Sequence, residues 1–214
     1  MKSKLCILLS VLVMMLGSCG DDESWAPAYI TDFADLRTDG NGVVVSMTLD
    51  DGREYVDVQL RDDFDGEADT VYRAICVYTL QNSEATLHSV TPAFAPQPIV
   101  DDGKLEIKTD PCIIQSIWRG GDYINARMLV QGKDLPHIAA FIDLGIAANA
   151  EGTAKVLTLQ LYHDSNGDAE AFTRTIYLSC PLRGYEDSLT RGRDSLAFVV
   201  NQANKGMTTY MFAY

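Results

Sequence analysis

Apolar and polar residues alternate along much of the chain from Tyr29 onward, with the two-residue period that is typical of half-buried β-strands. The first clear run, at 43–49, follows a dense turn signal at 39–42. Its predicted core side carries Val43, Val45, Met47 and Leu49. This pattern predicts a strand with one face against a hydrophobic core.

The residues after this run extend the same pattern into a small sheet. Asp50-Asp51-Gly52 indicates a hairpin, and the run 55–60 is the predicted return strand. Further strands are expected at 71–80 and 85–90. About five strands in about sixty residues favour a small meander or a partly open, OB-like barrel.

Three prolines between positions 92 and 98 mark the clearest boundary in the chain. Prolines this dense favour a stiff, extended connection and are excluded from central strands. We therefore expect a first domain at 29–91, a Pro-rich linker and lead-in at 92–111, and a second domain at 112–214.

The second domain again has short alternating runs, which are separated by turn signals such as Arg119-Gly120-Gly121-Asp122. The predicted strands are 112–118, 123–130, 137–144, 156–163, 172–178, 195–201 and 207–214. Seven strands of this kind favour an antiparallel sandwich. With no apolar stripe of helical period, the predicted fold class is all-β: an N-terminal OB-like small barrel followed by a C-terminal antiparallel β-sandwich.

The first eighteen residues have the layout of a bacterial secretory signal. A basic head precedes the apolar run 5–16, which is too short for a comfortable membrane span. Leu16-Gly17-Ser18-Cys19 then matches a lipobox, with an aliphatic residue, two small residues and a cysteine. We expect a signal peptide at 1–18 and lipidation of Cys19, with palmitate as an acyl group. The alternative is an ordinary secretory signal that happens to contain a cysteine.

Residues 19–28 are expected to form a tether behind the lipid anchor. Asp21, Asp22 and Glu23 suit a solvated spacer, and they also resemble the surface-export signal of some Gram-negative lipoproteins. The expected location is therefore the outer membrane of a Gram-negative bacterium, with the periplasmic and the outer face both open.

Charge excludes one class of partner. Without residues 1–18 the chain keeps 15 of its 17 basic residues and all 30 acidic ones, for a net charge of −15. Such a chain is repelled by phosphates, so we expect no nucleic-acid partner. Attachment to the membrane then depends on the lipid chains rather than on charge.

Several motifs resemble those of the NigD-like lipoproteins. They are IWRGGDYIN at 117–125, AFID at 140–143, LQLYHD at 159–164, NGD at 166–168 and the closing FAY at 212–214. The resemblance covers nearly the whole mature chain and is most specific from Cys112 to Tyr214. It implies an N-terminal OB-type domain and a C-terminal β-sandwich. It also implies a link to bacteriocin immunity, and it brings no catalytic residues.

Histidine and cysteine placement gives no catalytic or metal motif. His88, His137 and His163 are widely spaced, so we expect structural histidines, although a fold can unite the last two, which share a domain. Nucleophile elbows, P-loops and dinucleotide fingerprints are absent from the sequence. We therefore expect no enzyme, no cofactor and no metal. Cys112 and Cys180 are in one predicted domain, where a disulfide and two isolated buried thiols both remain open.

Two acidic segments are candidate binding sites. Asp164, Asn166, Asp168 and Glu170 resemble a calcium loop, but the spacing fails the EF-hand rule, and Asn166-Gly167 favours a hairpin turn. The loop 62–69 carries five acids. It is either a solvated loop or a surface for a basic partner such as a cationic peptide.

The candidate ligand-facing residues are Trp118, Tyr123 and Tyr185, which carry aromatic rings close to polar groups. A strand tryptophan in a sandwich core is the competing interpretation of Trp118. Together these observations predict a lipid-anchored cell-envelope protein that acts as a non-enzymatic binding or interaction module for a protein or peptide. An accessory glycan-binding surface lipoprotein is the alternative.

Overall fold

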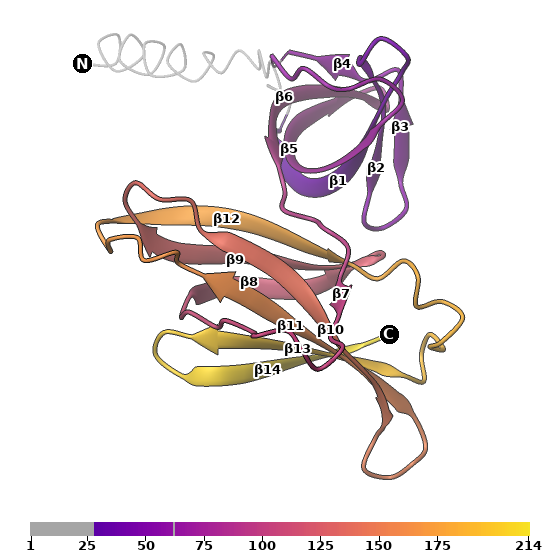
Figure 1. Cartoon of the computed structure of the whole chain (residues 1–214). Coiled ribbons are helices and arrows are strands. Elements are labelled where there is room, and N and C mark those ends of the chain that lie inside the picture. Colours follow the sequence, from indigo (N-terminus) through magenta and orange to yellow (C-terminus); the bar gives the residue numbers. More distant parts are fainter. Residues whose placement is uncertain (1–27, 62) are drawn as a thin grey trace, which may run out of the picture.

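The computed structural model describes residues 28–61 and 63–214. The predicted signal peptide, the predicted lipidation site Cys19 and nearly all of the predicted tether lie outside the described residues. Strands and turns account for the described part (Figure 1), in which no helix is long and apolar enough to cross a membrane.

The strands follow one another along the chain as two groups. The first group is β1 (Ile30–Thr38), β2 (Val44–Leu49), β3 (Glu54–Val56), β4 (Gln59–Leu60), β5 (Val71–Gln81) and β6 (Glu84–Pro92). The second is β7 (Ile99–Val100), β8 (Ile113–Gly120), β9 (Tyr123–Gly132), β10 (Ile138–Ala148), β11 (Lys155–Asp164), β12 (Phe172–Pro181), β13 (Ser195–Gln202) and β14 (Gly206–Ala213).

The N-terminal domain is one strongly curled sheet with strand order β3-β2-β1-β5-β6-β4, which confirms the OB-like, partly open barrel (Figure 1). Its core lies inside the curl and contains Leu36, Met47, Tyr78 and Leu87, all with no exposed surface. The curl closes toward β4, which pairs in parallel with β6. The sheet thereby wraps around its own apolar face.

Two details of this sheet differ from the prediction. Val43 and Val45 are exposed, whereas Val44 is buried, because a register shift in the β1–β2 pairing changes which face the early residues of β2 occupy. The expected return strand at 55–60 is also broken. Asp57 has a φ of 54°, which is outside the β region, so the segment divides into β3 and β4.

The C-terminal domain is a β-sandwich of two sheets, as expected. One sheet has the order β14-β13-β11-β10-β7 and the other β12-β9-β8. Most neighbours are antiparallel, but β11 and β13 pair in parallel, because β12 crosses to the other sheet between them. Apolar side chains from both sheets, including Met128, Phe141, Leu159 and Phe198, fill the space between.

The segment expected as a linker is partly built into the sandwich. Ala93 N–H donates to the Arg73 carbonyl oxygen in the first domain (2.9 Å). Phe94 is hydrogen-bonded through both its backbone groups to β12, at Tyr177 and Ser179. Further along, β7 pairs in parallel with β10. The chain therefore passes from one domain to the other without a free hinge at 93–94.

A buried polar cluster, which we call the junction cluster, joins the domains. It consists of Arg73, Asp35, Asp50, Asn125 and Ser179. The Arg73 side chain is 5% exposed, and it donates to Asp35 (3.2 Å), Asp50 (2.6 Å), Asn125 (3.0 Å) and Ser179 (2.9 Å). Asn125 and Ser179 belong to the second domain, so the single guanidinium of Arg73 fixes the position of one domain relative to the other.

Close backbone approach supports this junction. Gly120 and Gly121 lie against Asp50, where a Cβ atom on Gly121 would be 2.8 Å from the Asp50 carbonyl oxygen. Gly121 also has a φ of 54°. The glycines of the RGGD turn are therefore needed where the second domain meets the first.

Candidate functional site

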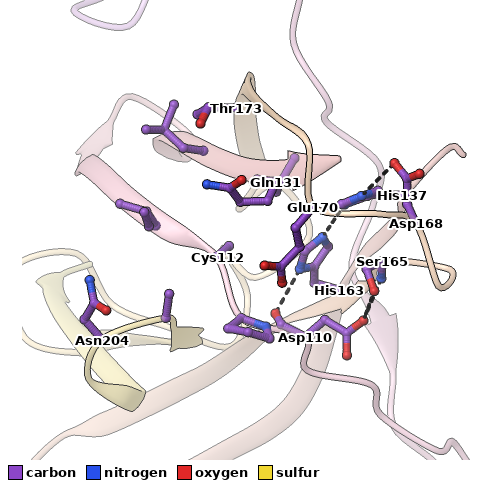
Figure 2. A pocket seen from close by; sticks show the side chains of 15 residues that line it. Asp110, Cys112, Gln131, His137, His163, Ser165, Asp168, Glu170, Thr173 and Asn204 are labelled. Carbon is purple, nitrogen blue, oxygen red and sulfur yellow. Dashed lines mark hydrogen bonds and ion pairs between the residues drawn. The ribbon is translucent and has the colours of Figure 1, made fainter. Parts of the chain in front are cut away.

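A cavity of about 550 Å³ opens at the end of the sandwich opposite the junction (Figure 2). Strands β9 and β12 connect the two places, since Tyr123 pairs with Pro181 near the junction and Gly132 with Phe172 at the cavity end. Polar side chains line the cavity: Asp110, Gln131, His137, His163, Ser165, Asp168, Glu170, Thr173 and Asn204. Loops cluster at the ends of sandwiches, where ligands commonly bind.

Two histidines from different strand ends meet in this cavity. His137 immediately precedes β10 and His163 is in β11; Ala139 is the strand partner of His163. The two rings face each other with Nδ1 of His137 2.9 Å from Nε2 of His163 (Figure 2). His163 is 2% exposed, and its burial lowers its pKa below the usual range. The structure thus unites two of the three histidines, and His88 lies in the other domain beside Thr79.

The hydrogen-bond partners of the pair define its proton positions. Nδ1 of His163 lies 2.9 Å from the Asp110 carbonyl oxygen, which only accepts, so this nitrogen carries the proton. Nε2 of His163 then accepts from Nδ1 of His137. In a neutral pair, Nε2 of His137 is left as an acceptor. It is buried without a hydrogen-bond partner among the described residues, as is Nε of Arg119.

Asp168 stands opposite that unpaired nitrogen. Its Oδ2 atom is 3.8 Å from Nε2 of His137, and the two side chains are 2% and 8% exposed. The carboxylate accepts backbone N–H groups of Lys133, Asp134, Leu135 and Ala169. Burial opposes ionisation of Asp168, but these four donors together hold its pKa well below the usual range. A fixed negative charge therefore faces the histidine pair.

The cavity does not join a nucleophile to a base in the described structure. Ser165 donates its hydroxyl proton to the Asp110 carboxylate (2.5 Å) rather than to a histidine. Cys112 contacts the Asn201 carbonyl oxygen, and burial raises the pKa of its thiol to about 12. The arrangement is suited to binding and to holding protons, not to nucleophilic attack.

The three predicted aromatic residues have different surroundings. Trp118 is 38% exposed and packs edge-on against Phe33 of the first domain, with ring centroids 5.6 Å apart. Tyr123 is buried at the junction, where its hydroxyl donates to Asp35 and its ring lies under Arg73. Tyr185 is partly buried and donates to Asp143 (2.8 Å). They do not share one surface patch, and Trp118 alone offers a half-exposed ring face.

The segment that resembles a calcium loop forms a tight turn, but the turn does not close the expected hairpin, because β11 and β12 belong to different sheets. Asn166 and Gly167 have φ values of 56° and 70°, and Asp168 N–H donates to the Ser165 carbonyl oxygen. Asp164 pairs with Lys108 (2.7 Å), while the Asp168 carboxylate accepts the backbone groups named above. The oxygens are thus directed to different partners. Cys76, Cys112 and Cys180 are free and buried.

Residues 63–69 of the acidic loop after β4 are held by side chains of β1 and β5. Thr38 donates its hydroxyl proton to the Glu67 carbonyl oxygen (2.6 Å), and Glu67 N–H donates to the Tyr72 hydroxyl (2.5 Å). Phe64 packs edge-on against Tyr72 at 5.0 Å. Asp63, Asp65, Glu67 and Asp69 remain exposed.

Solved structures from Bacteroides species share this architecture. A NigD-like immunity protein from Bacteroides caccae is 22% identical with a TM-score of 0.68, covering 89% of this chain and 98% of that one. A protein of unknown function from Bacteroides vulgatus is 18% identical with a TM-score of 0.66, covering 87% and 91%. A candidate lipoprotein from Bacteroides fragilis is 13% identical with a TM-score of 0.56, covering 88% and 96%. At these identities the likeness shows the fold, and none of these descriptions names an enzyme.

No curated protein matches the chain in sequence. The model of the NigD-like C-terminal β-sandwich domain, in contrast, matches residues 96–214, which is more than half of the 214 residues. The matched segment begins within the Pro-rich lead-in and contains the cavity and its two histidines. The chain therefore belongs to the NigD-like family.

Proposed function

We propose that this protein is a lipid-anchored interaction module of the outer membrane, attached through Cys19, which binds a cationic protein or peptide without catalysis. The relative from Bacteroides caccae is described as an immunity protein, and the relative from Bacteroides fragilis as a candidate lipoprotein. In this proposal the chain holds a bacteriocin-like basic partner at the cell envelope.

The ordered acidic loop is the observation that carries this proposal. Its exposed carboxylates belong to a loop whose backbone is already hydrogen-bonded to Thr38 and Tyr72. Little conformational entropy is therefore lost when a partner binds. Across the mature chain, 15 basic against 30 acidic residues favour encounter with a basic partner. The junction cluster keeps this loop in constant relation to the sandwich.

Binding to a cationic peptide tests the loop directly. We expect the variant Asp63→Asn, Asp65→Asn, Glu67→Gln, Asp69→Asn to lose most of the affinity and most of its salt dependence. A matched control neutralises exposed acids elsewhere, at Asp102, Glu106 and Glu151, and should bind as the wild type does. Unchanged binding by the loop variant would refute the proposed surface.

Immunity and anchoring need separate tests. A deletion strain should become more sensitive to a bacteriocin of the same species, and unchanged sensitivity counts decisively against the immunity role. Cys19→Ala should abolish incorporation of radiolabelled palmitate. Protease treatment of intact cells then distinguishes the outer face from the periplasmic face.

Glycan binding is a second candidate, favoured by the exposed ring of Trp118. This ring lines a small cavity together with Asp51 and Arg53, so it offers a platform ringed by hydrogen-bonding groups. We expect saturable binding on a glycan array that Trp118→Ala removes. Phe172→Ala is the matched control, because Phe172 is 64% exposed at the far end of the sandwich.

A further inference from the structure

We propose that His137 and His163 form a binding site for a divalent transition metal, with Zn²⁺ as the principal candidate. The site lies in the cavity of about 550 Å³. The proposed peptide and glycan surfaces do not include this cavity, so the metal site is independent of them. Imidazole nitrogens are favoured ligands of Zn²⁺, Cu²⁺ and Ni²⁺.

The spacing of the two nitrogens fits shared coordination. Nδ1 of His137 and Nε2 of His163 are 2.9 Å apart. Zinc–nitrogen bonds of about 2.0–2.1 Å at a tetrahedral angle place two nitrogens roughly 3.3 Å apart. An opening of a few tenths of an ångström, together with a rotation of the rings that turns both nitrogen lone pairs toward one point, would therefore replace the hydrogen bond with two metal bonds.

The far side of each ring has the partner that metal-bound histidines usually have. Such histidines donate the other ring N–H to a carboxylate or a backbone carbonyl, which fixes the tautomer. Nδ1 of His163 faces the Asp110 carbonyl oxygen at 2.9 Å, and Nε2 of His137 faces Asp168 at 3.8 Å (Figure 2). Asp168 is itself held in place by four backbone N–H groups.

Proton placement explains why His137 has an unpaired atom. Without a cation, a neutral His137 donates from Nδ1 to His163, and its Nε2 lone pair faces the Asp168 carboxylate, which is also an acceptor. With a metal between the rings, His137 takes the other tautomer. Its Nδ1 then binds the metal and its Nε2–H points at the Asp168 carboxylate, which would accept the proton once the 3.8 Å separation shortens by several tenths of an ångström. The move transfers one proton within the ring, and no group is left unmatched.

The remaining ligand positions belong to the cavity. In the described part of the chain, no three His, Cys, Asp or Glu side chains already converge on one point. Glu170 reaches into the same cavity from the loop after β11 and is exposed, so its carboxylate is free to swing toward the rings (Figure 2). Glu170 or water would complete an open site of the kind that accepts a further ligand.

Titration of the full-length chain in detergent with Zn²⁺ alone tests the proposal. We expect one saturable site per chain, with affinity at least a hundredfold lower in His137→Gln and His163→Gln. Asp168→Asn should lower it about 10–100-fold, because a lost outer partner weakens the ligand it orients. His88→Gln is the matched control and should bind as the wild type does. No saturable binding, or equal binding by the His137 and His163 variants, overturns the proposal.

A second measurement needs no variant and covers the case in which one fails to fold. Nitrogen chemical shifts of the wild-type imidazoles report which ring nitrogen carries the proton. Zn²⁺ should move the His137 proton from Nδ1 to Nε2 and leave the His163 proton on Nδ1. If His137 keeps its proton on Nδ1 in saturating Zn²⁺, the site is not where we place it.

Discussion

Two buried polar clusters lie at opposite ends of strands β9 and β12, and they differ in completeness. In the junction cluster, Arg73 has hydrogen-bond acceptors for all three of its guanidinium nitrogens, and Asp35 and Asp50 accept further donors. In the cavity, Nε2 of His137 has no hydrogen-bond partner among the described residues. Buried polar groups are normally matched, so the complete cluster is expected to stabilise the fold, and the incomplete cluster is where we expect a bound metal to act.

The largest effect is expected at the junction. Arg73→Met keeps the side-chain volume but leaves Asp35 and Asp50 without their buried cation, and we expect a loss of about 3–5 kcal/mol in the free energy of unfolding. Arg53→Met is the control, because Arg53 pairs with Asp51 in solvent and should cost at most about 1 kcal/mol. Urea unfolding measures both. Similar losses in the two variants would show that the junction cluster is not a stabilising lock.

Zn²⁺ should raise the stability of the protein through the cavity histidines and not through the junction cluster. At free Zn²⁺ about a hundredfold above the dissociation constant, the free energy of unfolding should rise by about 2.7 kcal/mol. His163→Gln should remove this increment and Arg73→Met should retain it. An equal gain in the His163 variant would contradict the comparison.

Glycine substitution separates the junction from an ordinary turn. Gly121→Ala adds a Cβ against the Asp50 backbone at a φ of 54°, while Gly152→Ala meets nothing within 4 Å at a φ of 69°. Backbone strain alone should cost about 1 kcal/mol at Gly152, and crowding should bring the cost at Gly121 to about 2 kcal/mol. Thermal unfolding of the two variants measures the difference. Equal destabilisation by the two variants would mean that the backbone at the junction moves to make room for the added Cβ atom.

The smallest effect is expected from acid. Burial and the neighbouring His137 lower the pKa of His163, and Asp110 and Asp164 only partly oppose this effect. Below about pH 6.5 the unfolded chain therefore binds a proton that the native chain does not bind. Stability should therefore fall as the pH falls from 6.5, by at most about 1.4 kcal/mol over one pH unit. His163→Gln should flatten this part of the stability profile, measured in metal-free buffer, and His88→Gln provides the control. A slope that His163→Gln leaves unchanged would exclude His163 as its source.

The sequence predicted the strands better than it predicted what joins them. Alternation and turn residues are local signals, so β5, β6 and the strands of the sandwich are confirmed nearly where they were expected. The broken strand at Asp57 and the parallel pairing of β11 with β13 depend on contacts distant in sequence, which leave no local period. For the same reason the Pro-rich segment appeared to be a linker, although Phe94 is paired with β12.

The histidine pair shows the same limit at the site. His137 and His163 are 26 positions apart, which matches no metal motif, and they meet because Ala139 and His163 are partners across β10 and β11. The strand register carried a usable signal, because His137 lies directly before β10, which pairs with the strand that contains LQLYHD. Asp168 gave no such signal, since its role depends on the backbone N–H groups of a distant turn.

The pairing of Phe94 with β12 also affects the order in which the contacts of the folded protein can form during synthesis. Phe94 bonds to Ser179, which lies 85 positions later in the chain (179 − 94), so this contact waits until most of the second domain has emerged. The hydrogen bonds of Arg73 to Asn125 and Ser179 likewise form only after those residues have been made. Until then the hydrogen bonds that join the two domains cannot form. The fixed relation between the domains is therefore acquired late in synthesis, after the strand that carries Ser179 has been made.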